Sequence, residues 1–270
     1  MVVKKITIAI TALFIIINIL LICLKTSNEV IIHPENLKAD PSSYIPPIID
    51  KINVNNNQVQ SLQAENVVIK ACKDNFCIKL RGDVAFEKPK NFRLKLYSIF
   101  GIELDVGSND QEFWYWSKRD KEKGLHFSNY ENIGKTRLKI SFNPLSIMKS
   151  LGLNDIKVSS LMDFKENENY YIINEIKRDE SSLQKVINTT VLDKKIDRIV
   201  GYYVKDLIGN LIASSEIEYK ENHPSIVKLT SNQENSSLII YLTNCKINET
   251  IEKSLWEMPN FNPRINIGEN

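Results

Sequence analysis

The chain has 270 residues, of which 43% are hydrophobic and 25% are charged. This composition excludes a disordered or fibrous protein and suffices for one large domain or two small ones. The formal net charge is +2, and Lys and Arg are scattered among acidic residues, so nothing in the charge pattern supports a nucleic-acid partner.

The N-terminus has the pattern of an export signal or a membrane anchor. Lys4 and Lys5 precede an apolar run from Ile6 to Leu24. The core of a signal peptide spans about 7–15 residues, whereas about 20 residues cross a bilayer, and this run is closer to the second length. We therefore expect residues 1–25 to be an apolar signal or membrane-anchor helix and the body to lie outside the cytoplasm, on the periplasmic side of a membrane.

Cys23 leaves the kind of anchor open. The stretch Leu20-Leu21-Ile22-Cys23 resembles a lipoprotein signal, in which the cysteine is lipidated and becomes the first residue. That pattern has a small residue before the cysteine, and Ile22 departs from it. An uncleaved anchor and a lipidated Cys23 remain alternatives. In a third, Cys23 is an ordinary apolar residue of the membrane segment.

A linker and a short helix follow. Residues 26–43 are polar and without periodicity, which predicts a linker. Serines before a proline-led apolar cluster predict a helix start, and the asparagine run 55–57 predicts its end. The apolar residues that share one face of this helix are Ile45, Ile48, Ile49 and Ile52.

Alternating apolar and polar residues predict strands through the rest of the chain. The clearest alternation lies in residues 91–107, where Leu94, Leu96, Leu104 and Val106 fall on the dry face. We expect strands at 62–71, 76–87, 91–98, 101–107, 111–117, 124–130, 157–164, 169–177, 184–193, 196–205, 211–219, 225–231 and 237–245.

One further helix is predicted at residues 143–152, between the two groups of strands. Pro144 suits its first turn, Gly152 ends it, and Met148 and Leu151 lie on its apolar stripe. It would plug the end of a sheet or act as a mobile element. Helices so few and short cannot cover parallel strands, so a mainly β fold with an antiparallel sheet is expected.

Cys72 and Cys77 flank a four-residue loop between two predicted strands. Both fall off the apolar rows of their strands and would face each other across the hairpin, as a disulfide requires. Free thiols and a metal site remain alternatives, although no second pair of ligands accompanies the cysteines. Cys245 has no evident partner.

The sequence lacks the patterns of a catalytic or metal site. His33, His126 and His223 have no partner at helical spacing, and there is no Gly-rich phosphate loop. Asp105, Asp110 and Glu112 lie on a strand face and a turn, where solvated acids are usual. We expect no catalytic residue, no metal and no cofactor.

Residues 113–116 make both faces of one strand aromatic. Depending on register, either Trp114 and Trp116 or Phe113 and Tyr115 join the dry face. This face is either ordinary core or the lining of an apolar cavity. The residues that we assign to such a ligand-binding cavity are Leu94, Leu96, Leu104, Val106, Trp114 and Trp116.

Several short motifs together resemble the LolA and LolB family of periplasmic lipoprotein-localisation factors. They are Phe86-Glu87-Lys88-Pro89-Lys90-Asn91-Phe92, Leu104-Asp105-Val106-Gly107-Ser108-Asn109, Phe113-Trp114-Tyr115-Trp116, the strand-turn-strand from Tyr202 to Ile212, Pro224-Ser225-Ile226 and Trp256-Glu257-Met258-Pro259. The similarity spans residues 44–260.

The resemblance implies that residues 44–270 form an unclosed antiparallel half-barrel of about eleven strands. Short helices would lid its apolar face, through Ile48, Ile52, Met148 and Leu151. In the soluble carrier of the family an arginine before the turn proline helps to hold the lid shut. Lys88 takes that position here, and lysine lacks the planar fork of arginine.

The resemblance also implies binding of acyl chains of lipids or lipoproteins, with envelope transport proteins as further partners. Anchored by its N-terminal segment, the chain would be an acceptor or a lipid sensor rather than a free carrier. The alternative is an envelope sensor or assembly protein that uses the half-barrel as a scaffold without lipid cargo. A filled core would favour that alternative, and a dry concave pocket would favour lipid binding.

Overall fold

The computed structural model of the protein describes residues 38–39, 45–74, 76–132, 144–159, 162–178 and 185–268. The chain divides into Met1–Leu37 and Lys38–Asn270, and every described residue belongs to the second unit. The predicted signal or anchor segment 1–25, with Cys23, lies outside the described residues. Across the ranges given, no helix has the length and apolarity needed to cross a bilayer.

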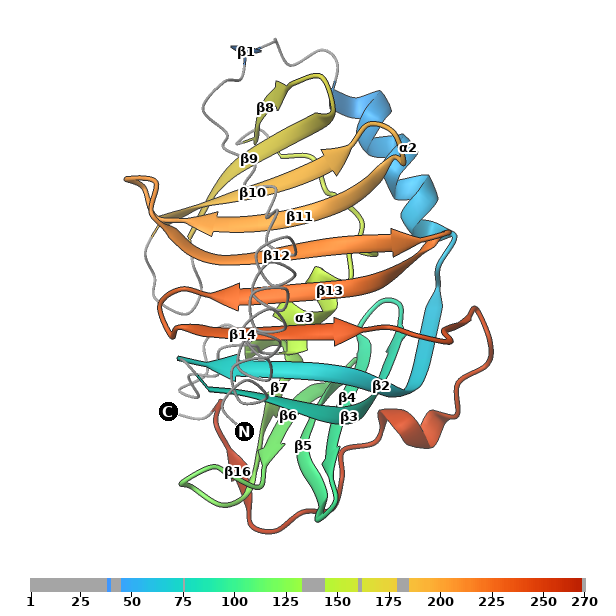
Figure 1. Ribbon diagram of the computed structural model, residues 1–270, viewed down its shortest axis with the longest axis vertical. Helices are drawn as coiled ribbons and strands as arrows, with labels where there is room; N and C mark the ends of the chain where they lie inside the picture. Colours follow the sequence, from blue (N-terminus) through green and yellow to red (C-terminus); the bar gives the residue numbers. More distant parts are fainter. Residues whose placement is uncertain are drawn as a thin grey trace, which may run out of the picture. The chain divides into compact units, whose positions relative to one another are not determined.

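One sheet of sixteen strands dominates this second unit (Figure 1). Its strands are β1 (Lys38–Ala39), β2 (Ser61–Lys73), β3 (Phe76–Glu87), β4 (Asn91–Ser98), β5 (Gly101–Ser108), β6 (Glu112–Ser117), β7 (Leu125–Asn129), β8 (Met162–Glu166), β9 (Tyr170–Arg178), β10 (Lys185–Asp193), β11 (Arg198–Lys205), β12 (Leu211–Lys220), β13 (His223–Ser231), β14 (Ser236–Tyr241), β15 (Lys246–Ile247) and β16 (Arg264–Asn266). The described helices are α2 (Ile45–Asn57), α3 (Pro144–Ser150) and the 3-10 turns η2 (Tyr130–Asn132) and η3 (Lys253–Trp256).

The strand order brings the two halves of the chain together where β14 pairs with β2. It runs β1-β8-β9-β10-β11-β12-β13-β14-β2-β3-β4-β5-β6-β7-β16, and β15 pairs with β2 off this path. The pairs are antiparallel, except that β16 runs parallel to β7. Because the path ends at β1 and β16 without joining them, the predicted mainly β fold with an unclosed antiparallel sheet is confirmed.

The observed elements differ from the predicted ones at several places. The sheet has sixteen strands rather than about eleven, and β15 and β16 have no predicted counterpart. Within the predicted linker 26–43, Lys38–Ala39 pairs with β8. The strand predicted at 157–164 begins only at Met162. Just before the predicted start, the backbone of residues 154–156 bonds to side chains of α2. The Asn56 side chain donates to the Asn154 carbonyl, and a backbone group used in this way cannot join a strand ladder.

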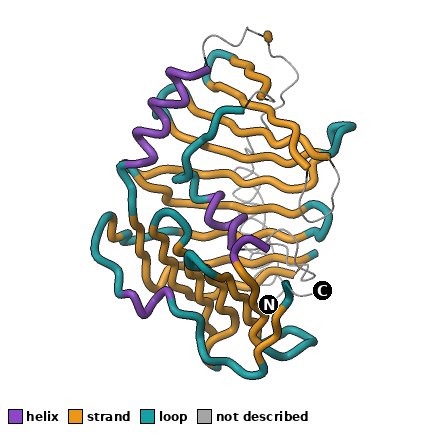
Figure 2. The backbone as a smooth tube through the Cα atoms, turned by 180° about the vertical axis from the view of Figure 1, so that it is seen from behind, coloured by secondary structure: helices purple, strands orange, loops and turns teal. Residues whose placement is uncertain are grey.

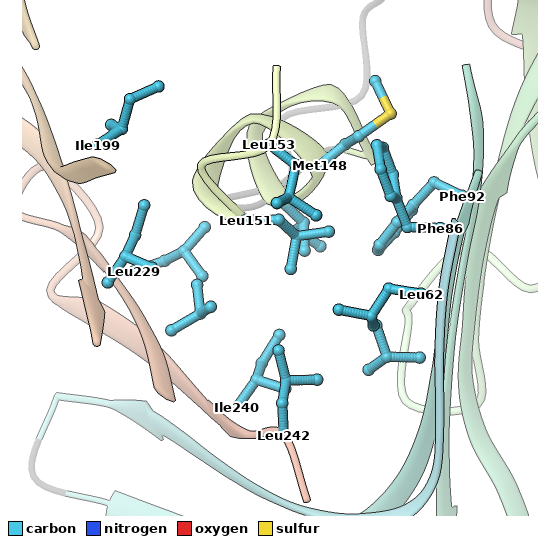
Figure 3. Packing of buried hydrophobic residues seen from close by; sticks show 14 of the residues in the cluster. Leu62, Phe86, Phe92, Met148, Leu151, Leu153, Ile199, Leu229, Ile240 and Leu242 are labelled. Atoms are coloured by element: carbon cyan, nitrogen blue, oxygen red, sulfur yellow. The ribbon is translucent and has the colours of Figure 1, made fainter. Parts of the chain in front are cut away.

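The sheet curves around α3. Seen from behind, α3 lies in front of the strands, on the concave face (Figure 2). In the close-up of the core, Leu62, Phe86 and Phe92 point inward from one side and Ile199 and Leu229 from the other (Figure 3). The α3 segment fills the space between them. Most of the buried apolar side chains therefore belong to one continuous core on the concave face.

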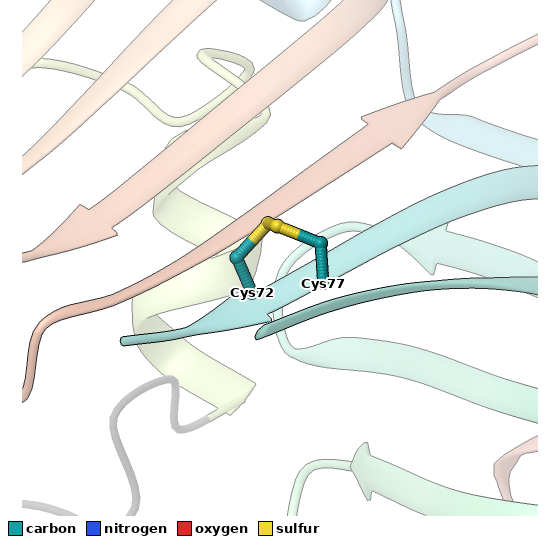
Figure 4. Close-up of a disulfide and its surroundings, with 2 residues drawn as sticks. All are labelled: Cys72 and Cys77. Atoms are coloured by element: carbon teal, nitrogen blue, oxygen red, sulfur yellow. A yellow bond between two sulfur atoms is a disulfide. The ribbon is translucent and has the colours of Figure 1, made fainter. Parts of the chain in front are cut away.

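The β2–β3 hairpin ends in a disulfide (Figure 4). Cys72 and Cys77 are directly paired residues, and their Cα atoms are 4.1 Å apart. The covalent bond therefore closes the hairpin at its turn, in the cross-strand arrangement that the sequence predicts. Cys245 is a free thiol, and burial raises its pKa to about 11.

Candidate functional site: the covered concave face

Four of the predicted cavity residues meet on neighbouring strands. Leu94 of β4 pairs with Val106 of β5, and Leu96 pairs with Leu104. Directly paired residues in an antiparallel sheet point to the same face. Leu94, Leu96 and Val106 are buried, and Leu104 packs against the same core. The apolar stripe predicted from alternation is therefore present on the concave face.

The assignment of Trp114 and Trp116 to this stripe is wrong. Trp114 pairs with Gly107 and Trp116 with Asp105, so both tryptophans share the convex face. The other register applies, in which Phe113 and Tyr115 point to the concave side, and Tyr115 packs against the core. A strand that is aromatic on both faces carries no signal in its own sequence that decides between these registers.

The α3 segment covers the stripe. Ile147, Met148, Leu151 and Leu153 are each at most 3% exposed and belong to the core. The predicted lid residues Met148 and Leu151 thus lie over the concave face. Their side chains, with those of Ile147 and Leu153, fill the space above the stripe. We call residues 144–156 the lid segment.

Gly152 lets the lid segment approach the sheet closely. Its φ of +70° belongs to the left-handed region, which favours glycine. A Cβ at this position would collide with the hydroxyl of Tyr219 and lie 2.8 Å from Cδ1 of Ile217. The glycine that ends the predicted helix is therefore also the point of contact with β12.

Helix α2 holds the far end of the lid segment through polar bonds. Ile52 is buried in the core and Ile48 packs against it, so both predicted lid residues of α2 contact the concave core. Asn53 accepts from the Ile156 amide at 2.8 Å and donates to the Ile156 carbonyl at 3.0 Å. These reciprocal bonds fix the end of the lid segment to the helix.

Lys88 links three parts of the molecule at the turn between β3 and β4. Its Nζ donates to the Asn57 side chain at 2.7 Å and to the Asn56 carbonyl at 3.3 Å, both at the end of α2. It also lies 3.4 Å from a carboxylate oxygen of Asp155 in the lid segment. The residue assigned to the latch by resemblance is therefore in contact with the lid segment, through an ammonium rather than a guanidinium.

The convex face of the same strands carries a buried ion pair. Arg93 donates to both carboxylate oxygens of Asp105, at 3.1 and 2.8 Å, and Trp114 Nε1 donates to Asp105 at 3.2 Å. The expectation of a solvated Asp105 is therefore wrong, because this side chain is 1% exposed. Arg93 also donates to the carbonyls of Leu255 and Glu257. The C-terminal segment, residues 248–268, is thereby tied to β4.

Sequence reasoning missed Arg93 because it counts as an ordinary polar residue in an alternating strand. The only signal was the placement of Asp105 two residues before Gly107, where the missing side chain leaves room for the Trp114 ring. Asp110 and Glu112 lie at the following turn and take no part in the pair. Within the described ranges, no cluster of three or more metal-ligating side chains forms.

Comparison with known proteins finds likeness in structure alone. Searches with the sequence match no family model and no curated protein. The structure is similar to a DUF1329 family protein from Desulfovibrio piger, with a TM-score of 0.53, 11% identity and coverage of 78% of this chain and 96% of that one.

Of two further similar structures, one is named for the LolA superfamily and the other for lipoprotein sorting. A LolA superfamily protein from Nitrosomonas europaea has a TM-score of 0.50 and 12% identity, with coverage of 78% and 96%. An outer membrane lipoprotein-sorting protein domain from Vibrio parahaemolyticus has a TM-score of 0.53 and 9% identity, with coverage of 78% and 94%. The chain therefore has the fold of these proteins, and identities this low show the fold alone.

Proposed function

We propose that this protein binds acyl chains of lipids or lipoproteins on the concave face of its half-barrel, as a binding protein rather than an enzyme. The observation that carries the proposal is how that face is covered. A helix of seven residues and the turn after it occupy the hollow of the sheet, and the polar contacts of Lys88 and Asn53 hold their far end. Displacing this segment would expose the apolar stripe without breaking any strand pair.

The energetics suit an acyl ligand. Each buried CH₂ contributes up to about 0.8 kcal/mol, so a chain of about a dozen methylenes gains at most about 10 kcal/mol. Its lost freedom and the loss of the lid-segment contacts oppose this gain. The ligand would replace the contacts that Met148 and Leu151 now make. We place the protein in the cell envelope, outside the cytoplasm, tethered through its N-terminal segment or a lipidated Cys23. The disulfide and the N-terminal pattern support this location.

Substitution on the apolar stripe tests the proposal. Leu104→Glu puts a carboxylate among apolar side chains, which is costly unless the group is neutralised or hydrated. We expect it to abolish the fluorescence of a bound acyl probe that lipid displaces from the wild-type protein. Ile208→Glu is the matched control, because Ile208 is 85% exposed at the β11–β12 turn. Circular dichroism must show that both variants fold.

A second candidate function rests on the packing itself. Leu94 and Val106 are buried against the lid segment, so the concave face is filled. That observation favours an envelope sensor or assembly protein that uses the half-barrel as a scaffold. Equal probe binding by folded wild type and Leu104→Glu, or none by either, would favour the scaffold over the lipid-binding protein.

A further inference from the structure

Lys149 of α3 forms no ion pair with the residues that the structure describes. Its Nζ lies 4.9 Å from the ring centroid of Tyr202 on β11. Among the residues that the structure describes, this cation–π contact is the only polar interaction of Lys149. An ammonium at a half-buried position gains far more from an anionic partner than one in open solvent.

The carboxylate that acts on the Lys149 charge belongs to Glu175 of β9, and other residues already bind it. Lys177 Nζ lies 2.7 Å from one of its oxygens, and the Ser159 hydroxyl donates to the other at 2.8 Å. Burial, together with the Lys177 charge, lowers the pKa of Lys149, and Glu175 opposes this only in part. Within the described part of the chain, Glu175 therefore pairs with Lys177 and not with Lys149.

Two hydroxyl groups face the same margin. Tyr202 and Ser215 are directly paired residues of β11 and β12, so their side chains share one face of the sheet. Tyr202 packs against the concave core, which identifies that face as the concave one. The Ser215 hydroxyl is buried and has no hydrogen-bond partner, and in the described ranges no hydrogen bond involves the Tyr202 hydroxyl. A buried, unpaired polar group calls for an explanation.

We propose that Lys149, Tyr202 and Ser215 bind the anionic head group, a carboxylate or a phosphate, of an amphiphile whose chain lies on the apolar stripe. This inference rests on the proposed acyl binding. A lysine ammonium is a compact charge with three donors, and two hydroxyls add donors to the same oxygens. Lys149 belongs to the lid segment, so the site requires that this segment, once the chain has displaced Met148 and Leu151 from the stripe, still holds the ammonium beside Tyr202.

Three photoreactive probes with the same diazirine-bearing chain test the inference on the full-length protein in phosphatidylcholine nanodiscs. One ends in a carboxylate, one in a glycerol phosphate and one in a neutral alcohol. The readout is labelling of the peptide that contains β4 and β5, measured by mass spectrometry against probe concentration. The variants are Lys149→Met, which removes the charge, and Lys149→Arg, which keeps it. Lys185→Met, at an exposed position of β10, is the control.

In the wild type, half-maximal labelling by an acidic probe should need about tenfold less probe than labelling by the alcohol. Lys149→Met should abolish this preference without weakening the alcohol, whereas Lys149→Arg and Lys185→Met should keep it. The acidic probe with the larger preference identifies the head group. Equal labelling by acids and alcohol in the wild type, or an unchanged preference in Lys149→Met, would overturn the head-group site and leave acyl binding standing. Failure of all three probes to label the wild type would overturn acyl binding as well.

Discussion

Strands β4 and β5 are covered on both faces, and the two covers are held in different ways. On the convex face the buried bidentate ion pair of Arg93 and Asp105 joins β4 to β5, and Arg93 also holds the C-terminal segment through bonds to two of its carbonyls. On the concave face the lid segment packs apolar side chains and ends in a lysine contact whose carboxylate, Asp155, is 48% exposed. A buried pair that loses one partner is strongly destabilising, whereas a partly exposed one contributes little. The convex contacts of Arg93 are therefore more deeply buried than the contact that ends the concave cover, and the proposed function requires only the concave cover to move.

Breaking the convex pair should have the largest effect. Asp105→Ala leaves Arg93 buried without its counter-ion and should lower the free energy of unfolding by about 3–5 kcal/mol. Urea denaturation followed by circular dichroism measures this. Asp163→Ala is the control, because it removes an exposed pair with Lys165 and should cost less than about 1 kcal/mol. Similar losses in the two variants would remove the distinction between the covers.

Removing the disulfide should have the next largest effect. The double variant Cys72→Ser, Cys77→Ser opens a short hairpin loop and should lower the free energy of unfolding by about 2–3 kcal/mol on the loop-entropy model. The same denaturation experiment under oxidising conditions detects it. Reducing agent should lower the free energy of unfolding of the wild type by a similar amount and leave that of the double variant unchanged. Alkylation of both Cys72 and Cys77 in unreduced protein from its own compartment would contradict both the bond and the proposed export.

Gly152→Ala should loosen the lid segment more than the sheet. The left-handed conformation costs a residue with a Cβ about 1–2 kcal/mol, and the new methyl group would also collide with Tyr219. We expect faster hydrogen exchange in residues 144–156 and unchanged exchange in β2 and β3. Gly101→Ala, with a positive φ and open space around it, is the matched control for backbone strain alone. Equal changes in exchange at the lid for both variants would argue against a specific contact at Gly152.

Lys88→Met should have the smallest effect on stability and the clearest effect on the lid. It removes the contact with the partly exposed Asp155 and two hydrogen bonds to the end of α2, so the free energy of unfolding should fall by about 1–2 kcal/mol. Binding of an acyl probe should nevertheless become faster, because less holds the lid segment closed. Stopped-flow fluorescence measures the rate. Lys88→Arg supplies the fork of donors that lysine lacks and should slow binding. If the two variants bind the probe at equal rates, or if Lys88→Arg binds faster than Lys88→Met, Lys88 does not hold the lid segment closed.

The concave stripe could be predicted from sequence because alternation alone assigns Leu94, Leu96, Leu104 and Val106 to one face. The same rule fails for residues 113–116, where both faces are aromatic and only pairing with Gly107 places Trp114 on the convex side. The Leu255 carbonyl that Arg93 contacts and the Ile156 backbone that Asn53 contacts lie more than a hundred residues away in the chain. Local sequence patterns cannot reveal such contacts. The bonds from Arg93 to the C-terminal segment and those from α2 to the lid segment could therefore be found only in the structure.

Locking the lid segment tests the central claim most directly. In a Cys245→Ser background, Lys88→Cys and Asp155→Cys place two thiols where a 3.4 Å contact now joins the turn to the lid segment, and a reversible bifunctional thiol reagent can bridge them. The controls are the two variants that carry only one of the introduced cysteines, treated with the same reagent. The account predicts that the bridged protein loses acyl-probe binding and that cleavage of the bridge restores it. Equal probe binding by the bridged and the cleaved protein would contradict a lid that must open.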